Sequence, residues 1–333
     1  MRIFSRRVVL AMLLLLWLVP MAAQRPKVGL VLGGGGAKGA AEIGVLKEIE
    51  RQNIPIDYIA GTSIGSIVGA LYSVGFCADE LDSLFRSQSW LSLFTDRSAK
   101  LQWEPYKVND GVTSIFGFPV WRNSPRKGGK EFDPTNIGVM KGDSITSLFR
   151  RLTMLPDSVN FDELPIPFRC VAFDLVADSE VVLTEGSLPL AMRSSMAIPG
   201  LFKPVSMNGM RLVDGGMANN LPVDVVREMG ADIVIAIDLT QDTVAKPSKF
   251  QLKEWTGIGG VLNYLVSRPD LEKYRENLKG IDLYINPRLP DDDATSFGSQ
   301  SISRMLKAGE REGKRQAKAL EKLRNRIFSN VPE

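Results

Sequence analysis

A five-residue stretch with glycine at both ends, Gly61-Thr62-Ser63-Ile64-Gly65, places the tightest constraint on how this chain can fold. An apolar run over residues 56–60 precedes it, and small and apolar residues typical of a closely packed helix follow. A strand, a sharp turn and a helix in this order form the G-x-S-x-G elbow, which holds its serine in a strained backbone conformation. Ser63 is therefore a candidate nucleophile. The alternative is a purely structural turn, in which glycine and serine are also common.

The first 23 residues have the composition of an export signal. Three arginines precede an uninterrupted apolar run over residues 8–19, and the small residues Ala22 and Ala23 follow. This order of charged, apolar and small residues is typical of a cleaved signal peptide. The apolar run is shorter than the roughly 20 residues that a membrane-spanning helix needs. We predict cleavage after Ala23 and a mature protein that is periplasmic, associated with an outer membrane, or secreted.

Composition excludes several kinds of site. Removing the three arginines of the signal from the 41 Lys+Arg leaves 38, equal to the 38 Asp+Glu, so net charge gives no reason to expect nucleic-acid binding. The chain has no histidine, so a serine nucleophile needs a base other than imidazole. The two cysteines, Cys77 and Cys170, are too few for a cysteine-based zinc site, and we expect both to be buried. No carboxylate cluster with the ligand spacing of a calcium site lies near the glycine-rich motifs. We therefore predict no cofactor and no metal.

Strand and helix patterns alternate through residues 24–240, which predicts a largely parallel central sheet covered by helices on both faces. We expect this segment to form one α/β/α domain. Residues 241–333 are more polar, and we expect them to form a mainly helical C-terminal extension that carries no recognisable chemistry. The predicted strands cover residues 27–32, 56–60, 168–175, 180–184, 210–213 and 233–238, and the predicted helices include residues 77–94, 142–152, 188–195, 223–229 and 298–327.

A glycine-rich loop follows the first predicted strand. Gly34, Gly36 and Gly39 have the G-x-G-x-x-G spacing of dinucleotide-binding loops. Backbone N–H groups at a helix N-terminus can hold a pyrophosphate or the oxyanion of an acyl-transfer intermediate. A dinucleotide site needs an acidic residue after the second strand, but here that strand ends at Ala60 and leads to Ser63. This favours an oxyanion hole, with a nucleotide-binding module as the alternative.

Asp214 is the candidate general base. It ends a short apolar strand and is followed by Gly215 and Gly216. The structural alternative is a hairpin turn, for which Asp-Gly is a standard signal. Asp174 and Asp238 also follow strand cores, but neither has a glycine pair behind it, and we expect structural roles for both.

Residues 97–130 lack periodicity and contain seven basic residues interleaved with aromatic side chains. Cations together with Trp and Tyr suit the headgroup region of a membrane, which predicts peripheral membrane contact. An ordinary long surface loop is the alternative.

Taken together, the segments Gly34–Gly39, Gly61–Gly65 and Asp214–Gly216 resemble the bacterial patatin-like phospholipases, a family of lipid acyl hydrolases with a Ser-Asp dyad. The resemblance covers residues 27–238, and residues 193–200 also resemble a block that these proteins carry before the aspartate. One departure is Glu42, where many bacterial members have histidine. That position lies on the first helix, so we expect activity to survive.

The resemblance implies a cofactor-free phospholipase A type of ester hydrolysis on phospholipid or another lipid ester. Ser63 would be the nucleophile, Asp214 the base, and the N–H groups of Gly35 and Gly36, with Gly34, the oxyanion donors. The remaining motif positions are Lys38, Gly39, Gly61, Gly65, Gly215 and Gly216. We expect Lys38 to be solvated or capping, with contact to an anionic headgroup as the alternative. A different class of function is a non-catalytic exported domain that docks to a partner through its tail.

Overall fold

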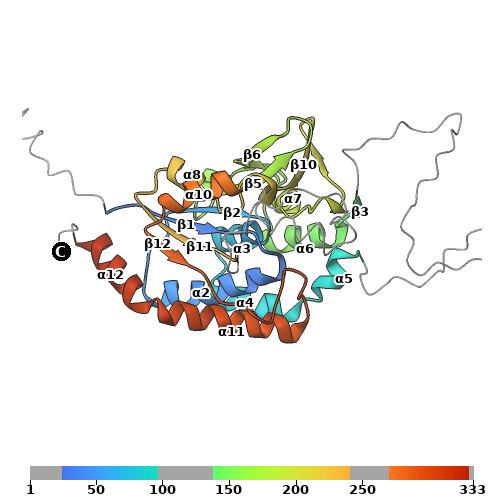
Figure 1. The fold of residues 1–333 in the computed structure, drawn as a ribbon. Helices are drawn as coiled ribbons and strands as arrows, with labels where there is room; N and C mark the ends of the chain where they lie inside the picture. The colour runs from blue at the N-terminus through green and yellow to red at the C-terminus, as the bar shows by residue number, and fades with distance from the viewer. Residues whose placement is uncertain (1–24, 97–137, 241–269, 330–333) are drawn as a thin grey trace, which may run out of the picture.

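An eight-stranded sheet forms the centre of the molecule (Figure 1). The computed structural model describes residues 25–96, 138–240 and 270–329. The strands of the sheet are β1 (Val28–Leu32), β2 (Tyr58–Thr62), β5 (Phe168–Asp174), β6 (Ser179–Leu183), β9 (Val205–Met207), β10 (Met210–Asp214), β11 (Ile233–Ile237) and β12 (Leu283–Ile285). Their order is β12-β11-β1-β2-β5-β10-β9, with β6 paired to β5. The first five strands in this order run parallel, whereas β6, β9 and β10 form antiparallel pairs.

Helices cover both faces of the sheet, which confirms the predicted α/β fold with a mostly parallel sheet. One face is covered by α2 (Ala40–Arg51), α3 (Ile64–Ser73), α4 (Ala78–Ser87), α7 (Leu188–Ser195), α11 (Ser299–Arg315) and α12 (Ala317–Phe328). The other face carries α8 (Val223–Glu228) and α10 (Leu271–Lys279). Leu30 of β1 packs on the first face and Val31 on the second. Because both faces are buried, the strands read as continuous apolar runs.

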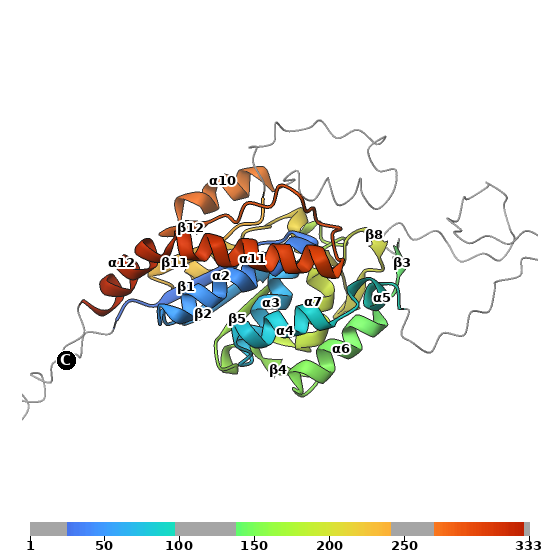
Figure 2. The same cartoon turned by 90° about the horizontal axis from the view of Figure 1, so that it is seen from below.

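The C-terminal segment shares the sheet with the residues before it. Strand β12 pairs in parallel with β11, and Figure 2 shows α11 lying across α2. Gly309 of α11 lies against the backbone of Ala41, where any side chain would clash. The helix predicted at 298–327 is divided at Gln316 into α11 and α12.

The end of the molecule beyond α4 is built from short elements. These are α5 (Trp90–Phe94), β3 (Gly138–Met140), α6 (Asp143–Thr153), β4 (Val159–Asn160), β7 (Glu185–Gly186) and β8 (Gly200–Phe202). The helix predicted at 77–94 is divided here into α4 and α5, because Gln88 adopts an extended backbone conformation. Strands β3 and β8 pair in parallel, with Met140 opposite Phe202. Among the described residues no helix has the length and apolar character to cross a bilayer.

The two cysteines differ in exposure. Cys170 is buried in β5 as predicted, whereas Cys77 is exposed, so that expectation was wrong. Cys77 occupies the position before α4, where its backbone N–H donates to the Glu80 carboxylate at 2.9 Å.

Candidate active site

Two strands bring Ser63 and Asp214 together by ending against each other on one edge of β5. Thr62, the last residue of β2, pairs with Val171, and Asp214, the last residue of β10, pairs with Ala172. Because β2 runs parallel and β10 antiparallel to β5, their carboxyl ends meet. The Ser63 hydroxyl donates to Asp214 Oδ2 at 2.6 Å, although 151 positions separate the two residues.

The backbone at Ser63 is strained. Its φ of 53° and ψ of −123° lie in a region that costs a non-glycine residue on the order of 1–3 kcal/mol. Gly61 and Gly65 make this turn possible, because a side chain on either would meet the backbone opposite it. Ser195 secures the turn: its hydroxyl accepts the Ser63 N–H at 2.8 Å and donates to the Val171 carbonyl at 2.5 Å. Sequence reasoning missed this role of Ser195.

Asp214 is held as a desolvated carboxylate. Its side chain is 2% exposed, and Oδ1 accepts the Gly216 N–H at 2.8 Å. Burial raises the pKa of Asp214 to about 6, although hydrogen bonds from Ser63 and Gly216 oppose this shift. The residues after Asp214 form a 3-10 turn, η4 (Gly215–Met217), and not a hairpin. A carboxylate with this pKa can accept a proton near neutral pH.

The glycine loop offers two free donors beside Ser63, not three. The Gly34 N–H donates to the Asn220 carbonyl at 3.1 Å, so this group is already occupied and the prediction for Gly34 is corrected. Within residues 25–96, 138–240 and 270–329, the N–H groups of Gly35 and Gly36 have no hydrogen-bond acceptor. Gly36 has a φ of 58°, a left-handed conformation that favours glycine.

A segment near the C-terminus, residues 291–297, lies against the glycine loop. The Ala294 carbonyl accepts the Ala37 N–H at 2.9 Å, and a side chain on Gly36 would clash with the same carbonyl. This carbonyl faces the start of the helix, where a nucleotide site would hold its pyrophosphate. The arrangement disfavours the nucleotide-binding alternative.

Lys38 is neither solvated nor placed to reach a headgroup. Its side chain is 3% exposed, and Nζ donates to the Leu239 carbonyl at 2.7 Å. The predicted solvated role is wrong, because the buried lysine joins the start of the first helix to the carbonyl of Leu239, just after β11. Gly39 packs against Ile64, leaving no room for a side chain.

An apolar cavity of about 150 Å³ opens over Ser63. Its walls come from segments far apart in the chain: α5, β3, β8 and residues 294–297. They include Gly36, Ile64, Ile67, Leu91, Phe94, Met140, Met196, Ile198, Leu201, Phe202, Ala294 and Phe297. The sequence alone gave no role to Ala294 and Phe297, because residues that line an apolar cavity form no sequence motif. The cavity can accept an apolar chain with its polar end at the dyad.

The other aspartates have local partners. Asp174 accepts the backbone N–H groups of Arg211 and Val176, at 2.8 and 3.0 Å. Asp238 accepts the Tyr274 and Tyr284 hydroxyls, at 2.7 and 2.9 Å. In the described part of the chain, no three acidic or cysteine side chains gather as a metal site. The predicted signal and the basic, aromatic residues 97–130 lie outside the described residues.

The comparisons with known proteins agree with these motifs. A family model described as patatin-like phospholipase matches residues 30–227. The chain belongs to the patatin-like phospholipase family. Neuropathy target esterase sws of Drosophila melanogaster is 35% identical over 216 residues, which cover 64% of this chain and 13% of that protein. Lysophospholipase NTE1 of Mycosarcoma maydis is 36% identical over 212 residues, 64% of this chain and 10% of that protein.

These patatin-like relatives are much longer than the part that matches. Human patatin-like phospholipase domain-containing protein 6 is 34% identical over 214 residues, and the match spans only 13% of its length. Among solved structures, VipD from Legionella pneumophila is 15% identical with a TM-score of 0.49, over 90% of this chain and 68% of that chain.

Proposed function

We propose that this chain is a serine lipid acyl hydrolase of the phospholipase A type. The observation that supports this most strongly is the 2.6 Å hydrogen bond from Ser63 to the buried carboxylate of Asp214. The family supports a lipid ester as the substrate, and the apolar cavity over Ser63 suits an acyl chain.

In the proposed mechanism, Ser63 Oγ attacks the ester carbonyl while Asp214 takes the hydroxyl proton. Burial prepares Asp214 for this step, because it raises the pKa of the carboxyl to about 6. The proton then passes to the departing alcohol, and the carbon–oxygen bond to that alcohol breaks. Asp214 next takes a proton from a water molecule, whose oxygen attacks the acyl-serine carbonyl. The bond from the carbonyl carbon to Ser63 Oγ breaks, Asp214 returns the proton to Oγ, and the fatty acid leaves.

The oxyanion is proposed to lie against the N–H groups of Gly35 and Gly36. Both groups follow the same strand, on a loop whose Gly34 N–H and Gly33 N–H are fixed at 3.1 Å to neighbouring carbonyls. Donors held in place before the reaction stabilise charge without reorganisation, and losing one typically costs on the order of a hundredfold in rate. The fixed residues before them therefore matter for catalysis.

Fatty-acid release from mixed phospholipid vesicles in the presence of chelator tests the proposal. We expect release by the wild type and none by Ser63→Ala or Asp214→Asn. Ser194→Ala is a matched control, because this serine is also buried and, within the described residues, its hydroxyl donates only to the Leu190 carbonyl of its own helix. Release that persists in Ser63→Ala would refute the dyad. Turnover of a small aryl ester without release from phospholipid would keep the mechanism and change the substrate.

Export through residues 1–23 and membrane contact through residues 97–130 belong to the same proposal. N-terminal sequencing of the protein after expression in an exporting host tests the first, with Gln24 as the expected first residue. An intact Met1 on protein recovered outside the cytoplasm would contradict cleavage.

A further inference from the structure

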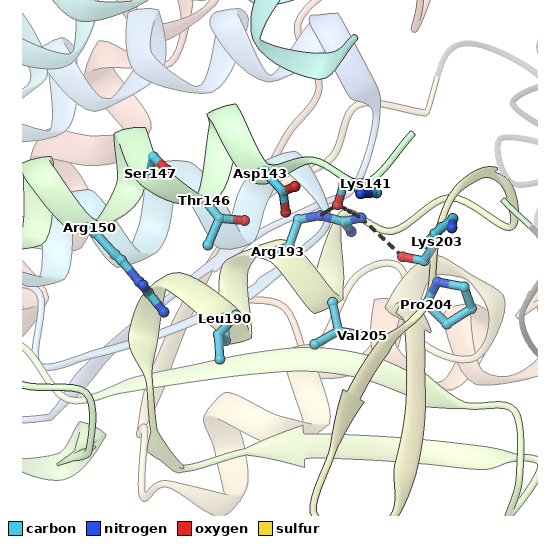
Figure 3. A pocket seen from close by; sticks show the side chains of 10 residues that line it. All are labelled: Lys141, Asp143, Thr146, Ser147, Arg150, Leu190, Arg193, Lys203, Pro204 and Val205. Atoms are coloured by element: carbon cyan, nitrogen blue, oxygen red, sulfur yellow. Dashed lines mark hydrogen bonds between the residues drawn. The ribbon is translucent and has the colours of Figure 1, made fainter. Parts of the chain in front are cut away.

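A second, cationic cavity lies behind the wall of the apolar cavity over Ser63, which we call the acyl cavity. It has a volume of about 540 Å³ and lies between α6, the end of α7 and the residues after β8. Figure 3 shows Lys141, Arg150, Arg193 and Lys203 around it. Among the described residues, Asp143 is the one carboxylate in this lining, and Asp96 lies close enough to interact with Arg193 from outside it, so four cations outnumber two anions. We call this cavity the cationic groove.

No ion pair within the described ranges neutralises the cations of the groove. In the ranges that the structure covers, the side chains of Lys141, Arg150 and Lys203 have no ion-pair or hydrogen-bond partner, and all three are exposed. Arg193 is 2% exposed. Its Nη2 donates to the Lys141 carbonyl at 2.7 Å and to the Lys203 carbonyl at 3.0 Å. Its Nη1 has no partner among the described residues. Its hydrogen bonds go to neutral carbonyls, and the carboxylates of Asp96 and Asp143 lie near enough to attract its charge without forming an ion pair with it in the described part of the chain.

The groove and the acyl cavity share the β3–β8 ladder. Met140 and Phe202 are register partners and line the acyl cavity, whereas Lys141 and Lys203 follow them in sequence and line the groove. The Arg193 guanidinium lies 4.7 Å from the centre of the Phe202 ring. One layer of backbone therefore separates the site for apolar chains from a cluster of cations.

Apolar side chains are exposed at the same ladder. Val139 of β3 is 65% exposed, and Leu91 of α5, which lines the acyl cavity, is 67% exposed. Exposed apolar residues beside unpaired cations match a lipid surface, whose acyl region lies next to anionic phosphates.

We propose that the cationic groove binds the phosphates of anionic phospholipid headgroups and so seats the mouth of the acyl cavity on an anionic membrane surface. This inference rests on the proposed function, which requires the enzyme to reach lipid in a bilayer. An anionic bilayer attracts each nearby lysine by about 1 kcal/mol. Removing Lys141 and Lys203 should therefore weaken binding on the order of 30-fold.

Binding is measured by flotation of the full chain with vesicles of phosphatidylcholine alone or mixed with phosphatidylglycerol. All proteins carry Ser63→Ala, so that no lipid is consumed. Lys141→Ala/Lys203→Ala keeps the backbone carbonyls that hold Arg193, and Lys141→Arg/Lys203→Arg keeps the charge. Lys318→Ala/Lys322→Ala is the matched control: both lysines are exposed without an ion pair in the described structure, on α12 at the opposite end of the molecule from β3 (Figures 1 and 2).

We expect the parent protein to bind phosphatidylglycerol vesicles. The alanine pair should bind them on the order of 30-fold more weakly, whereas the arginine pair and the control pair should bind them as the parent does. Equal binding by the alanine pair, or failure of the parent protein to prefer phosphatidylglycerol, would overturn the proposal. A parent protein that binds inorganic phosphate at constant ionic strength but does not bind vesicles would also overturn the proposal, in favour of a site for free phosphate. Since Ser63→Ala abolishes the proposed chemistry, these outcomes are independent of aryl-ester hydrolysis by the wild type, which tests the proposed function.

Discussion

Two loops meet over Ser63, and they hold the candidate site by different means. The glycine loop, residues 33–39, is fixed by backbone groups: the Gly33 and Gly34 N–H groups donate to carbonyls of Ile237 and Asn220. Segment 291–297 shares one backbone bond with that loop, from the Ala37 N–H to the Ala294 carbonyl, and side chains add to its hold. Asp293 accepts the Thr295 N–H at 2.8 Å, and Asp292 pairs with Arg304 at 2.6 Å.

The two loops also offer different things to a substrate. The glycine loop presents N–H groups, whereas segment 291–297 presents the apolar ring of Phe297. This ring packs edge to face on Phe94, with 4.8 Å between the ring centres. A backbone donor must be in one position to stabilise charge, whereas an apolar wall can vary in shape. We therefore expect changes in the glycine loop to lower kcat on every ester, and changes in segment 291–297 to alter acyl-chain preference.

The largest of the expected effects follows from Gly36→Ala. Gly36 has a φ of 58° and lies against the Ala294 carbonyl, so the new methyl group must displace one of the two loops. We expect kcat on a short aryl ester to fall on the order of a hundredfold or more. Gly298→Ala is the control, because nothing lies within 4 Å of a Cβ at that position. A similar loss in both variants would remove the distinction between the loops.

A pH profile distinguishes proton transfer at Asp214 from the fit of the acyl chain in its cavity. In the proposed mechanism Asp214 acts as a base only when ionised, and burial raises its pKa to about 6. The rate should be constant well above this pKa and fall as pH decreases through it. Two pH units below, we expect a loss of about a hundredfold in kcat/KM, the same for short and long acyl chains. A profile that is flat across this range in stopped assays would exclude Asp214 as the base.

Phe297→Ala should affect substrate choice and not chemistry. Removing the ring enlarges the acyl cavity and deletes its contact with Phe94. We expect kcat/KM for long-chain esters to change by about tenfold and that for acetyl esters to stay the same. Phe328→Ala is a suitable control, since Phe328 is 44% exposed at the end of α12. An equal loss on acetyl esters would mean that segment 291–297 also positions the dyad.

Glu42→Gln should have the smallest effect on activity and a measurable effect on stability. Both carboxylate oxygens are buried and form no well-aligned hydrogen bond with the described residues. Burial raises the pKa of Glu42 well above its usual value; the nearby Gly33 N–H opposes this shift and Asp238 adds to it. A raised pKa means that the folded state holds this proton more tightly, so the contribution of Glu42 to stability is greatest at low pH. That contribution should fall by about 1.4 kcal/mol per pH unit between the unfolded and the folded pKa.

Glutamine keeps the neutral shape and cannot ionise, so thermal unfolding of Glu42→Gln should lack this decline. Parallel stability curves for the two proteins between acidic and alkaline pH would show that Glu42 is not held neutral.

The sequence predicted those parts of the molecule that depend on local backbone constraints. The alternating pattern indicated the fold, and the glycine pairs beside Ser63 and Asp214 marked positions where no side chain fits. It could not indicate that β2 and β10 end against each other on β5, because strand pairing is a long-range property. For the same reason it missed that the Gly34 N–H is occupied by Asn220 and that Ala294 caps the loop.

Lys38 shows a second limit of sequence reasoning. A lysine in a glycine-rich loop reads as a surface residue, because burial of an ammonium group is rare. Its partner, the Leu239 carbonyl, lies 201 positions away and becomes available only when β11 ends beside β1.

The central claim is that Asp214 activates Ser63, and covalent labelling with a fluorophosphonate tests it most directly. Such probes modify only serines whose hydroxyl is activated. Mass spectrometry with peptide mapping should find one adduct, on Ser63, in the wild type and no adduct in Asp214→Asn. Labelling of Ser63 that is undiminished in Asp214→Asn, or an adduct on another serine alone, would contradict the account.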